Sequence, residues 1–334
     1  MTPVEALERI IHCLDRAHIG GFKTKAWVRA LDVARATPLE ELEARRKADT
    51  LTDLPGIGDS TAGVIEQALD GVVPAYLTKL EAETALPMSD AAAVIREQLK
   101  GDCHSHSFWS DGGASIERMA ATARDLGHEY FVLTDHSPRL TVAHGLNRQR
   151  LEDQLIEIEA LNAEMAPFRI LTGMEVDINE DGTLDLDDDL LGRLDVVVAS
   201  VHSKLRMERQ PMTERMVRAV ASPHVDILGH CTGRLIEKRP QSVFDADYVF
   251  AACAQFGTAV EINSRPERLD PPPELLHIAL EHGCVFTIDT DAHATGQLEW
   301  QVHGCEIAAG GGVPIERIMN VRDADSLLAW TADR

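Results

Sequence analysis

Apolar residues recur at three- and four-residue spacings throughout residues 1–98. The segment PVEALERIIHCLDRAHI shows this pattern clearly, and the pattern returns in the segments 21–36, 38–51, 75–87 and 89–100. Such spacing places the apolar side chains on one face of a helix. The pattern therefore predicts an all-helical domain over residues 1–98.

The pattern changes after residue 98, where seven short β-branched or aliphatic runs alternate with helical stretches. The runs are the segment before Ser105, FVLTDH, RILTGMEVDI, DVVVASVHS, VDILGH, TAVEIN and CVFTIDTDAH. Alternating strands and helices are typical of a parallel sheet, and continuously apolar runs such as VVVAS predict strands buried on both faces. We expect residues 99–334 to form an α/β domain whose seven strands close into a (β/α) barrel. An open doubly wound sheet is the alternative.

Composition is that of a folded globular protein. Of 334 residues, 44% are hydrophobic and 26% are charged, which excludes a disordered chain. No apolar run approaches the ~20 residues of a membrane helix, so we expect no membrane partner. The acidic start does not resemble a secretory signal. The six cysteines are scattered and form no CxxC pair, which favours reduced thiols and a cytoplasmic location.

The formal net charge is -23. It argues against wrapping of duplex DNA by a broad basic face, because such binding depends on many cationic contacts to phosphates. A local contact with a phosphate chain stays open.

Each of the seven runs ends in polar residues of the kinds that bind metals. Two pairs, His104 with His106 and Asp291 with His293, stand at i and i+2, so on an extended chain both members point the same way. Functional groups of parallel barrels collect at the carboxyl ends of the strands. We therefore expect one metal-binding bowl formed by His104, His106, Asp111, His136, Glu175, His202, His230, Asp291 and His293.

This donor set limits the chemistry of the expected site. Six imidazoles and three carboxylates are too many for one tetrahedral zinc and suit two or three metals that share carboxylates. The mixture favours zinc, manganese or iron over magnesium or calcium. Asp135 points away from the bowl on a regular strand and is expected to support the ligands. Glu261 and Asn263 end the sixth run without an assigned role.

Basic residues follow the same run ends. Cations around a multi-metal bowl would bind an anionic substrate, and phosphate is the obvious one. The candidate phosphate-binding residues are Arg139, Lys204, Arg234 and Arg265.

Together these motifs resemble a known family. GDCHSHSFWSDG, LTDHSP, GMEVDI, ASVHS, ILGHCTGRL, AVEINSRPERLD and IDTDAHA resemble, in this order, the motifs of PHP domains, the polymerase and histidinol phosphatase family. Within that family, the segment is most similar to the C-terminal PHP domain of bacterial family X DNA polymerases. The resemblance implies a distorted seven-stranded β/α barrel that holds three divalent metal ions.

The resemblance also implies how the ligands divide. One metal would take His104, His106, Glu175 and Asp291. A second would share Glu175 and add His202 and His230, and a third would take Asp111, His136 and His293. We take Glu175, Asp291 and His230 as the catalytic residues within this set.

The helical part contains a candidate nucleic-acid motif. Leu54-Pro55 and the residues Gly56, Ile57 and Gly58 resemble a helix-hairpin-helix turn, whose backbone N–H groups can face a phosphate. Lys23 and Lys25 add a small basic stripe. A plain pair of antiparallel helices is the alternative, and Asp59 would repel a phosphate. Val64 stands where lyase relatives place a lysine, so we expect no lyase activity.

These features predict a metal-dependent phosphoesterase in which a metal-bound hydroxide attacks the ester. Only a few residues separate the two predicted domains, so no polymerase palm or fingers fit between them and we expect no nucleotidyl transfer. DNA 3′ ends are the expected substrate, through 3′-5′ exonuclease or 3′-phosphatase action. The alternatives are a small phosphomonoester such as histidinol phosphate, or a non-catalytic binding module stabilised by metals.

Overall fold

The computed structural model describes residues 1–20 and 22–333, and the chain folds into two compact units. We call Met1–Leu86 the N-terminal unit and Pro87–Arg334 the barrel unit. Gly21, the first residue of the second predicted helix, lies outside the described residues.

The described part of the N-terminal unit consists of helices, as the sequence predicts. Its α-helices are α1 (Pro3–Arg16), α2 (Phe22–Ala36), α3 (Leu39–Lys47), α4 (Asp59–Leu69) and α5 (Ala75–Glu83), with a short 3₁₀ turn η1 (Leu51–Asp53) before α4. Helix α1 begins at a capping box, in which Thr2 and Glu5 satisfy each other's backbone N–H groups. Its buried stripe of Ala6, Leu7, Ile10, Cys13 and Leu14 belongs to the core of this unit.

The turn before α4 contains the residues for which the sequence predicts a helix-hairpin-helix motif. Gly56 has φ +105°, a value that favours glycine, and a Cβ there would lie 2.8 Å from the Arg29 side chain. The N–H of Ile57 donates to the carbonyl of Leu54 at 3.0 Å. The N–H of Gly58 donates to Thr61 Oγ1 at 2.9 Å. Two of the N–H groups of this turn are therefore used within the turn itself.

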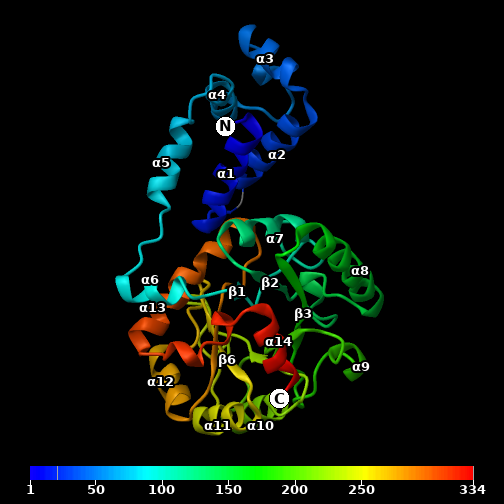
Figure 1. Cartoon of the computed structure of the whole chain (residues 1–334), viewed down its shortest axis with the longest axis vertical. Coiled ribbons are helices and arrows are strands. Elements are labelled where there is room, and N and C mark those ends of the chain that lie inside the picture. Colours follow the sequence, from blue (N-terminus) through cyan, green and yellow to red (C-terminus); the bar gives the residue numbers. More distant parts are fainter. Residues whose placement is uncertain (21, 334) are drawn as a thin grey trace. The chain divides into compact units, whose positions relative to one another are not determined.

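The barrel unit contains one sheet of seven parallel strands in sequential order, surrounded by helices (Figure 1). The strands are β1 (Gly101–Asp102), β2 (Tyr130–Leu133), β3 (Arg169–Asp177), β4 (Val196–Ser200), β5 (Ile227–Leu228), β6 (Ala259–Asn263) and β7 (Phe286–Asp289). Their residues are almost all buried, as expected for strands covered on both faces. The predicted seven-stranded α/β fold is confirmed.

The two ends of the sheet meet just beyond β1 and β7. Ser105 and Ala292 form a parallel bridge there, the N–H of His106 donates to Ala292 O at 2.8 Å, and the N–H of Asp291 donates to His104 O at 3.0 Å. The sequential strand order and this bridge describe a barrel, and the open doubly wound alternative is wrong.

Helices alternate with these strands on the outside of the sheet. They are α7 (Ile116–Asp125), α8 (Arg148–Met165), α9 (Asp188–Leu191), α10 (Arg209–Val220), α11 (Ala246–Phe256) and α12 (Pro273–Glu281). After β7 follow α13 (Gln301–Gly311) and α14 (Ala324–Ala332), which the sequence patterns did not predict. Gln301 and Asn320 from this last segment donate to the carbonyls of Gly101 and Ile288, so the segment fastens β1 to β7.

The division between the units lies earlier than the expected boundary between residues 98 and 99. Helix α6 (Asp90–Arg96) follows the N-terminal unit, yet Ala92, Ile95 and the nearby Leu99 are buried in the largest core cluster of the barrel unit. The predicted helix over 89–100 is thus real but packs with the barrel, because its apolar side chains fit against α13.

Two further observations bear on the sequence expectations. All six cysteines are buried, and none forms a disulfide among the described residues. Among the described residues, no helix combines the length and apolar character that crossing a bilayer requires.

Candidate metal centre

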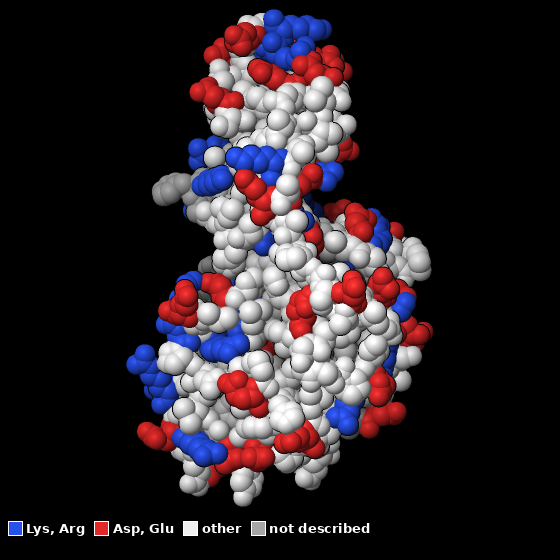
Figure 2. Space-filling view, turned by 90° about the vertical axis from the view of Figure 1, so that its left-hand side faces the viewer, with Lys and Arg blue, Asp and Glu red and all other residues white. Residues whose placement is uncertain are grey.

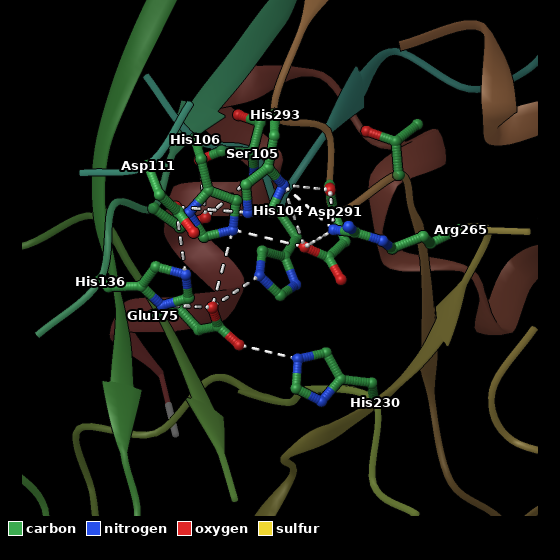
Figure 3. Close-up of polar contacts among 12 residues, drawn as sticks. His104, Ser105, His106, Asp111, His136, Glu175, His230, Arg265, Asp291 and His293 are labelled. Atoms are coloured by element: carbon green, nitrogen blue, oxygen red, sulfur yellow. Dashed lines mark hydrogen bonds and ion pairs between the residues drawn. The ribbon is translucent and has the colours of Figure 1, made fainter. Parts of the chain in front are cut away.

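The nine predicted ligands lie at the carboxyl ends of the strands. Glu175 lies within β3, two positions before its last residue, and is paired with Val198 of β4. The other eight follow a strand end, so each side chain sits on a segment anchored by the sheet. The described structure therefore brings together all nine side chains that the sequence singled out (Figure 3 labels eight of them).

The two i, i+2 pairs reach the centre in different ways. His104 and His106 flank Ser105, which is held in the barrel-closing bridge, so their segment is extended as expected. Asp291 instead has φ +53°, a left-handed conformation that is uncommon for a residue other than glycine. The simple extended-chain argument therefore holds for the first pair and not for the second. Strained backbone of this kind clusters at functional sites.

Glu175 lies at the middle of the cluster, and its carboxylate faces five imidazoles. Its Oε1 is 2.9 Å from His230 Nε2 and 3.1 Å from His202 Nε2. Its Oε2 is 2.9 Å from His136 Nδ1, 3.3 Å from His104 Nε2 and 3.6 Å from His106 Nε2 (Figure 3). Both oxygens of one buried carboxylate are thus shared between neighbouring ligand groups, which is the arrangement a bridging ligand needs.

A second carboxylate closes the open side of the cluster. Asp111 Oδ1 lies 3.3 Å from His293 Nε2 and 3.5 Å from His136 Nε2. Asp111 is about one-third exposed, whereas Glu175 is almost fully buried. Four groups have ligand atoms within 4.8 Å of one another, namely His106–Asp111–His136–His293, His104–His106–Asp291, His104–Glu175–His230 and His136–Glu175–His202.

Buried polar atoms that have no hydrogen-bond partner indicate that these groups fit cations. Among the described residues, such atoms include both ring nitrogens of His106 and His230, Nε2 of His104 and both oxygens of Glu175. A buried polar atom without a partner costs ~1–3 kcal/mol. Imidazole nitrogens and carboxylate oxygens gathered in this way are the donor set that transition-metal cations take.

The charges of the cluster depend on one another. Burial by itself would raise the pKa of Glu175, but the nearby His202, His104 and His136 hold it well below its usual range. Burial opposes protonation of His202, yet the adjacent Glu175 and Asp177 raise its pKa to about 9. Burial, together with His293 and His136, lowers the pKa of His106 well below its usual value. Without cations, protons on some imidazoles balance the buried carboxylates, so binding of cations would release protons.

Two further carboxylates contact the Nδ1 atoms of predicted ligand imidazoles. Glu261 Oε1 lies 2.6 Å from His104 Nδ1, and its Oε2 accepts from the N–H of His230 and from Asn263 Nδ2. Asp177 contacts His202 Nδ1. Carboxylates that hydrogen-bond a ligand imidazole fix its orientation and tautomer. Sequence reasoning assigned Glu261 no role and missed Asp177, although each stands two residues from another polar residue near a strand end.

Asp135 supports the segment that carries Asp111. It accepts hydrogen bonds from the N–H of Ser107 at 2.8 Å, Ser107 Oγ at 2.7 Å and Gln154 Nε2 at 2.7 Å. Ser110 Oγ donates to the same carboxylate. The supporting position predicted for Asp135 agrees with these contacts, which fix the backbone between His106 and Asp111.

The four predicted phosphate-binding cations differ in position. Arg265 Nη1 lies 3.5 Å from Asp291 Oδ1 and 3.2 Å from His293 Nδ1, so it borders the cluster (Figure 3). Arg139 and Lys204 are exposed, and Arg139 Nη1 donates to Asn179 Oδ1 at 2.8 Å. Arg234 donates to the carbonyls of Arg268 and Leu269. Its guanidinium is therefore bound to the backbone rather than turned toward the cluster.

Arg268 is a candidate that the sequence reasoning missed. Its Nε donates to Asp291 Oδ2 at 3.0 Å, and its side chain is only 12% exposed. Its Nη1 is buried and, within the described structure, has no hydrogen-bond partner. The motif AVEINSRPERLD contains both arginines, so its second arginine was the available signal.

Comparisons with known proteins agree with this geometry. The model of the PHP domain family matches residues 102–265. DNA polymerase/3'-5' exonuclease PolX of Bacillus subtilis (strain 168) is 42% identical over 243 residues, which cover 72% of this chain and 43% of that protein. The chain thus spans less than half the length of this relative. A probable phosphatase of Thermoanaerobacter sp. (strain X514) is 27% identical over 236 residues, covering 66% of this chain and 89% of the phosphatase.

Among solved structures, the chain resembles histidinol phosphate phosphatase from Lactococcus lactis subsp. lactis Il1403, which was crystallised with zinc, L-histidinol and phosphate. The TM-score is 0.47 and the sequence identity is 19%, over 64% of this chain and 94% of that chain.

Replacing Glu261 by glutamine is expected to weaken metal binding. The amide would turn its NH₂ group either toward the donors of His230 and Asn263 or toward His104, so either the His230 segment or the His104 ring would lose its hydrogen-bond acceptor. Loss of such a supporting partner typically costs ~10–100-fold in metal affinity. Metal content after dialysis against buffered zinc or manganese, measured by elemental analysis, tests this.

The matched control is Glu129→Gln, because Glu129 forms an exposed ion pair with Lys100. The control should bind metal like the unaltered protein. Equal metal affinity in the Glu261→Gln protein would contradict the assigned role of Glu261.

Proposed function

Because residues 102–265 belong to the PHP domain family, we propose that this chain is a metal-dependent phosphoesterase that acts on DNA 3′ ends. The single observation that carries the proposal is the contact of one buried carboxylate, Glu175, with five imidazoles. Such a cluster binds cations rather than packing a core, because buried charges without partners are costly.

We assign three divalent cations to the cluster, with zinc, manganese or iron favoured by the mixed imidazole and carboxylate donors. The proposed ligands of the first are His104, His106, Glu175 and Asp291. Glu175, His202 and His230 bind the second, and Asp111, His136 and His293 bind the third. Two of the four groups of neighbouring donors support this division, since one lies within the first set and another contains the whole third set together with His106. The other two groups join the sets through the shared Glu175.

Cations held there would polarise the phosphoryl oxygens and lower the pKa of an attacking water toward neutrality. The chain's own residues orient and neutralise the substrate. Arg265 and Arg268 enter the cluster from one loop, and both already contact Asp291. Arg268 Nη1, a buried donor without a hydrogen-bond partner in the described structure, is available for a phosphate. Charge-assisted hydrogen bonds from guanidinium groups suit the charge that develops on phosphoryl oxygens.

Glu175, Asp291 and His230 are the proposed catalytic residues. Glu175 holds neighbouring ligand groups at a fixed separation through its two oxygens. Asp291 is fixed between His106 and the two arginines, so it couples the metal cluster to the phosphate-binding loop. The burial of Glu175 and His230 excludes bulk water from this side of the cluster, which strengthens every charge interaction there.

The DNA 3′ end is the proposed substrate because the relative with 42% identity is a DNA polymerase/3'-5' exonuclease. The probable phosphatases among the relatives favour the second candidate, a small phosphomonoester such as histidinol phosphate. The face presented in Figure 2 carries intermixed acidic and basic side chains, which suits short contacts with a strand better than wrapping of a duplex.

The N-terminal unit is the proposed DNA contact. Gly56, Ile57 and Gly58 form the turn before α4, and Lys23 and Lys25 are exposed on α2. Since Ile57 and Gly58 use their N–H groups within the turn, the first-turn N–H groups of α4 are the better candidates for a phosphate contact. The exposed Asp59 beside them opposes an anion, so the contribution of the lysines becomes decisive.

A substrate panel tests the proposed function. With manganese or zinc added, we expect the full chain to release product from a 3′-recessed oligonucleotide or a 3′-phosphate end faster than from histidinol phosphate. Glu175→Gln should reduce turnover by more than ~100-fold, because loss of a supporting partner alone costs ~10–100-fold in such sites and Glu175 is a proposed ligand itself.

Circular dichroism of the Glu175→Gln protein provides the control for folding. Undiminished hydrolysis by a folded Glu175→Gln protein would refute the mechanism. Preference for histidinol phosphate would select the second candidate, and hydrolysis of none of the substrates by the metal-loaded chain would leave a non-catalytic binding module.

Arg268→Gln is expected to weaken inhibition by inorganic phosphate by ~10-fold or more, since a hydrogen bond to a charged group contributes ~1.5–3 kcal/mol. Arg139→Ala, which removes an exposed arginine, should change the inhibition constant far less. Metal content is measured in parallel. If Arg268→Gln loses metal while phosphate inhibition stays unchanged, Arg268 only positions Asp291.

A salt titration tests the role of the N-terminal unit. We expect the full chain, held in EDTA, to bind a single-stranded oligonucleotide with an affinity that falls as salt rises. Each lysine that contacts a phosphate contributes ~0.7 to the slope of log affinity against log salt, so Lys23→Ala should lower the slope by that amount. Lys79→Ala is the control, because Lys79 is exposed and paired with Glu83. An unchanged slope for Lys23→Ala would remove Lys23 from the DNA contact.

A further inference from the structure

The turn between His106 and Asp111 has a rigid backbone. Ser107 is fully buried and bound to Asp135 through its N–H and its hydroxyl. The N–H of Gly112 donates to Ser107 O at 2.9 Å, and a Cβ on Gly112 would lie 2.7 Å from the Ser107 backbone. The N–H of Phe108 donates to Ala114 O at 2.9 Å. This turn therefore holds its side chains in fixed directions.

The two aromatic residues of the turn differ in their contacts and in their exposure to solvent. Trp109 is anchored, because its Nε1 donates to Glu157 Oε2 at 2.9 Å and the Arg150 guanidinium lies 5.8 Å from its ring centre. Phe108 is 64% exposed. The contacts of Trp109 help to hold the turn in place. The exposed side chain of Phe108 contributes little to the core, so packing does not explain an aromatic residue at this position.

A second exposed apolar side chain lies on a neighbouring rim segment. Val142, in the loop after β2, is 85% exposed. Arg150 ties this loop to the turn, because it donates to the carbonyls of His144 and Gly145 and also to the carbonyl of Trp109. The segments after β1 and β2 are thus joined through Arg150, and each carries one exposed apolar side chain.

We propose that Phe108 is a specificity-determining residue that stacks on the base of the terminal nucleotide while the phosphate of that nucleotide lies at the metal cluster. This inference rests on the proposed function. Phe108 stands two residues after His106 and three before Asp111, both proposed ligands. Its exposed ring therefore lies on the same short segment as these two ligands.

A nucleobase is the occupant that the side chain favours. A phenyl ring offers a flat π face, and base–aromatic stacking is sequence-tolerant because every base has one. Arg265 and Arg268 lie on the loop after β6, whereas Phe108 lies on the segment after β1. The cationic side chains for the phosphate and the aromatic side chain for the base therefore come from different segments of the chain.

The test compares two oligonucleotides that differ only at the 3′-terminal residue, which carries a base in one and is abasic in the other. For the full metal-loaded chain, we expect Phe108→Ala to raise KM for the base-bearing end by ~10-fold, within the range measured for loss of one stacking contact. The KM for the abasic end and inhibition by inorganic phosphate should stay unchanged. Phe108→Trp should retain the original KM.

A binding measurement gives a second readout. With 2-aminopurine at the 3′ terminus and the metal-loaded chain mixed rapidly, so that binding is recorded before hydrolysis, its fluorescence should be quenched by the unaltered chain and less so by Phe108→Ala. The matched control is Phe256→Ala, since Phe256 is an exposed aromatic residue at the other end of the barrel, where α11 leads into β6.

Equal effects of Phe108→Ala on both oligonucleotides, or no effect on either, would overturn the inference while leaving the proposed function intact. If the unaltered metal-loaded chain hydrolyses neither oligonucleotide, that result would instead contradict the proposed function.

Discussion

The structure depends on one constraint, which is that a carboxylate buried away from water needs cationic or hydrogen-bonding partners. Glu175 satisfies this constraint at the centre of the cluster, because each of its oxygens faces imidazoles that follow different strands. Removed from water, a carboxylate would ordinarily take up a proton. Here the surrounding imidazoles keep the pKa of Glu175 well below its usual range. Glu261 and Asp177 in turn contact the imidazoles of His104 and His202, and each fixes a ring that would otherwise be free to turn.

The barrel makes this balance geometrically possible. Strand β3 supplies Glu175 directly, while the other ligands lie on segments that leave the strand ends. Closure at Ser105 and Ala292 brings the His104–His106 segment beside the Asp291–His293 segment. The arginines of the loop after β6 then contact Asp291. The proposed metal site and the proposed phosphate site are therefore joined through one aspartate whose own backbone is held in a left-handed conformation.

The sequence predicted the seven strands and the convergence of the nine side chains because both follow from simple periodicity. A buried parallel strand is continuously apolar, and the polar residue that ends it must lie at the same edge as its neighbours. The sequence pattern does not indicate in which direction a long side chain points. Arg234 and Arg268 both stand a few residues beyond strand ends, yet Arg234 turns to backbone carbonyls and Arg268 to Asp291. The sequence also did not predict that α6 packs with the barrel unit, because an apolar stripe on a helix does not indicate which core the helix joins.

Closure of the ring has a consequence for synthesis on the ribosome. The histidines at 104 and 106 emerge early, but their partners at 291 and 293 are translated almost two hundred codons later. Contacts between such distant positions form late, because a long loop must first be closed. The proposed sites of the first and third cations include Asp291 or His293. These two sites are therefore complete only after β7 has been translated and has joined β1.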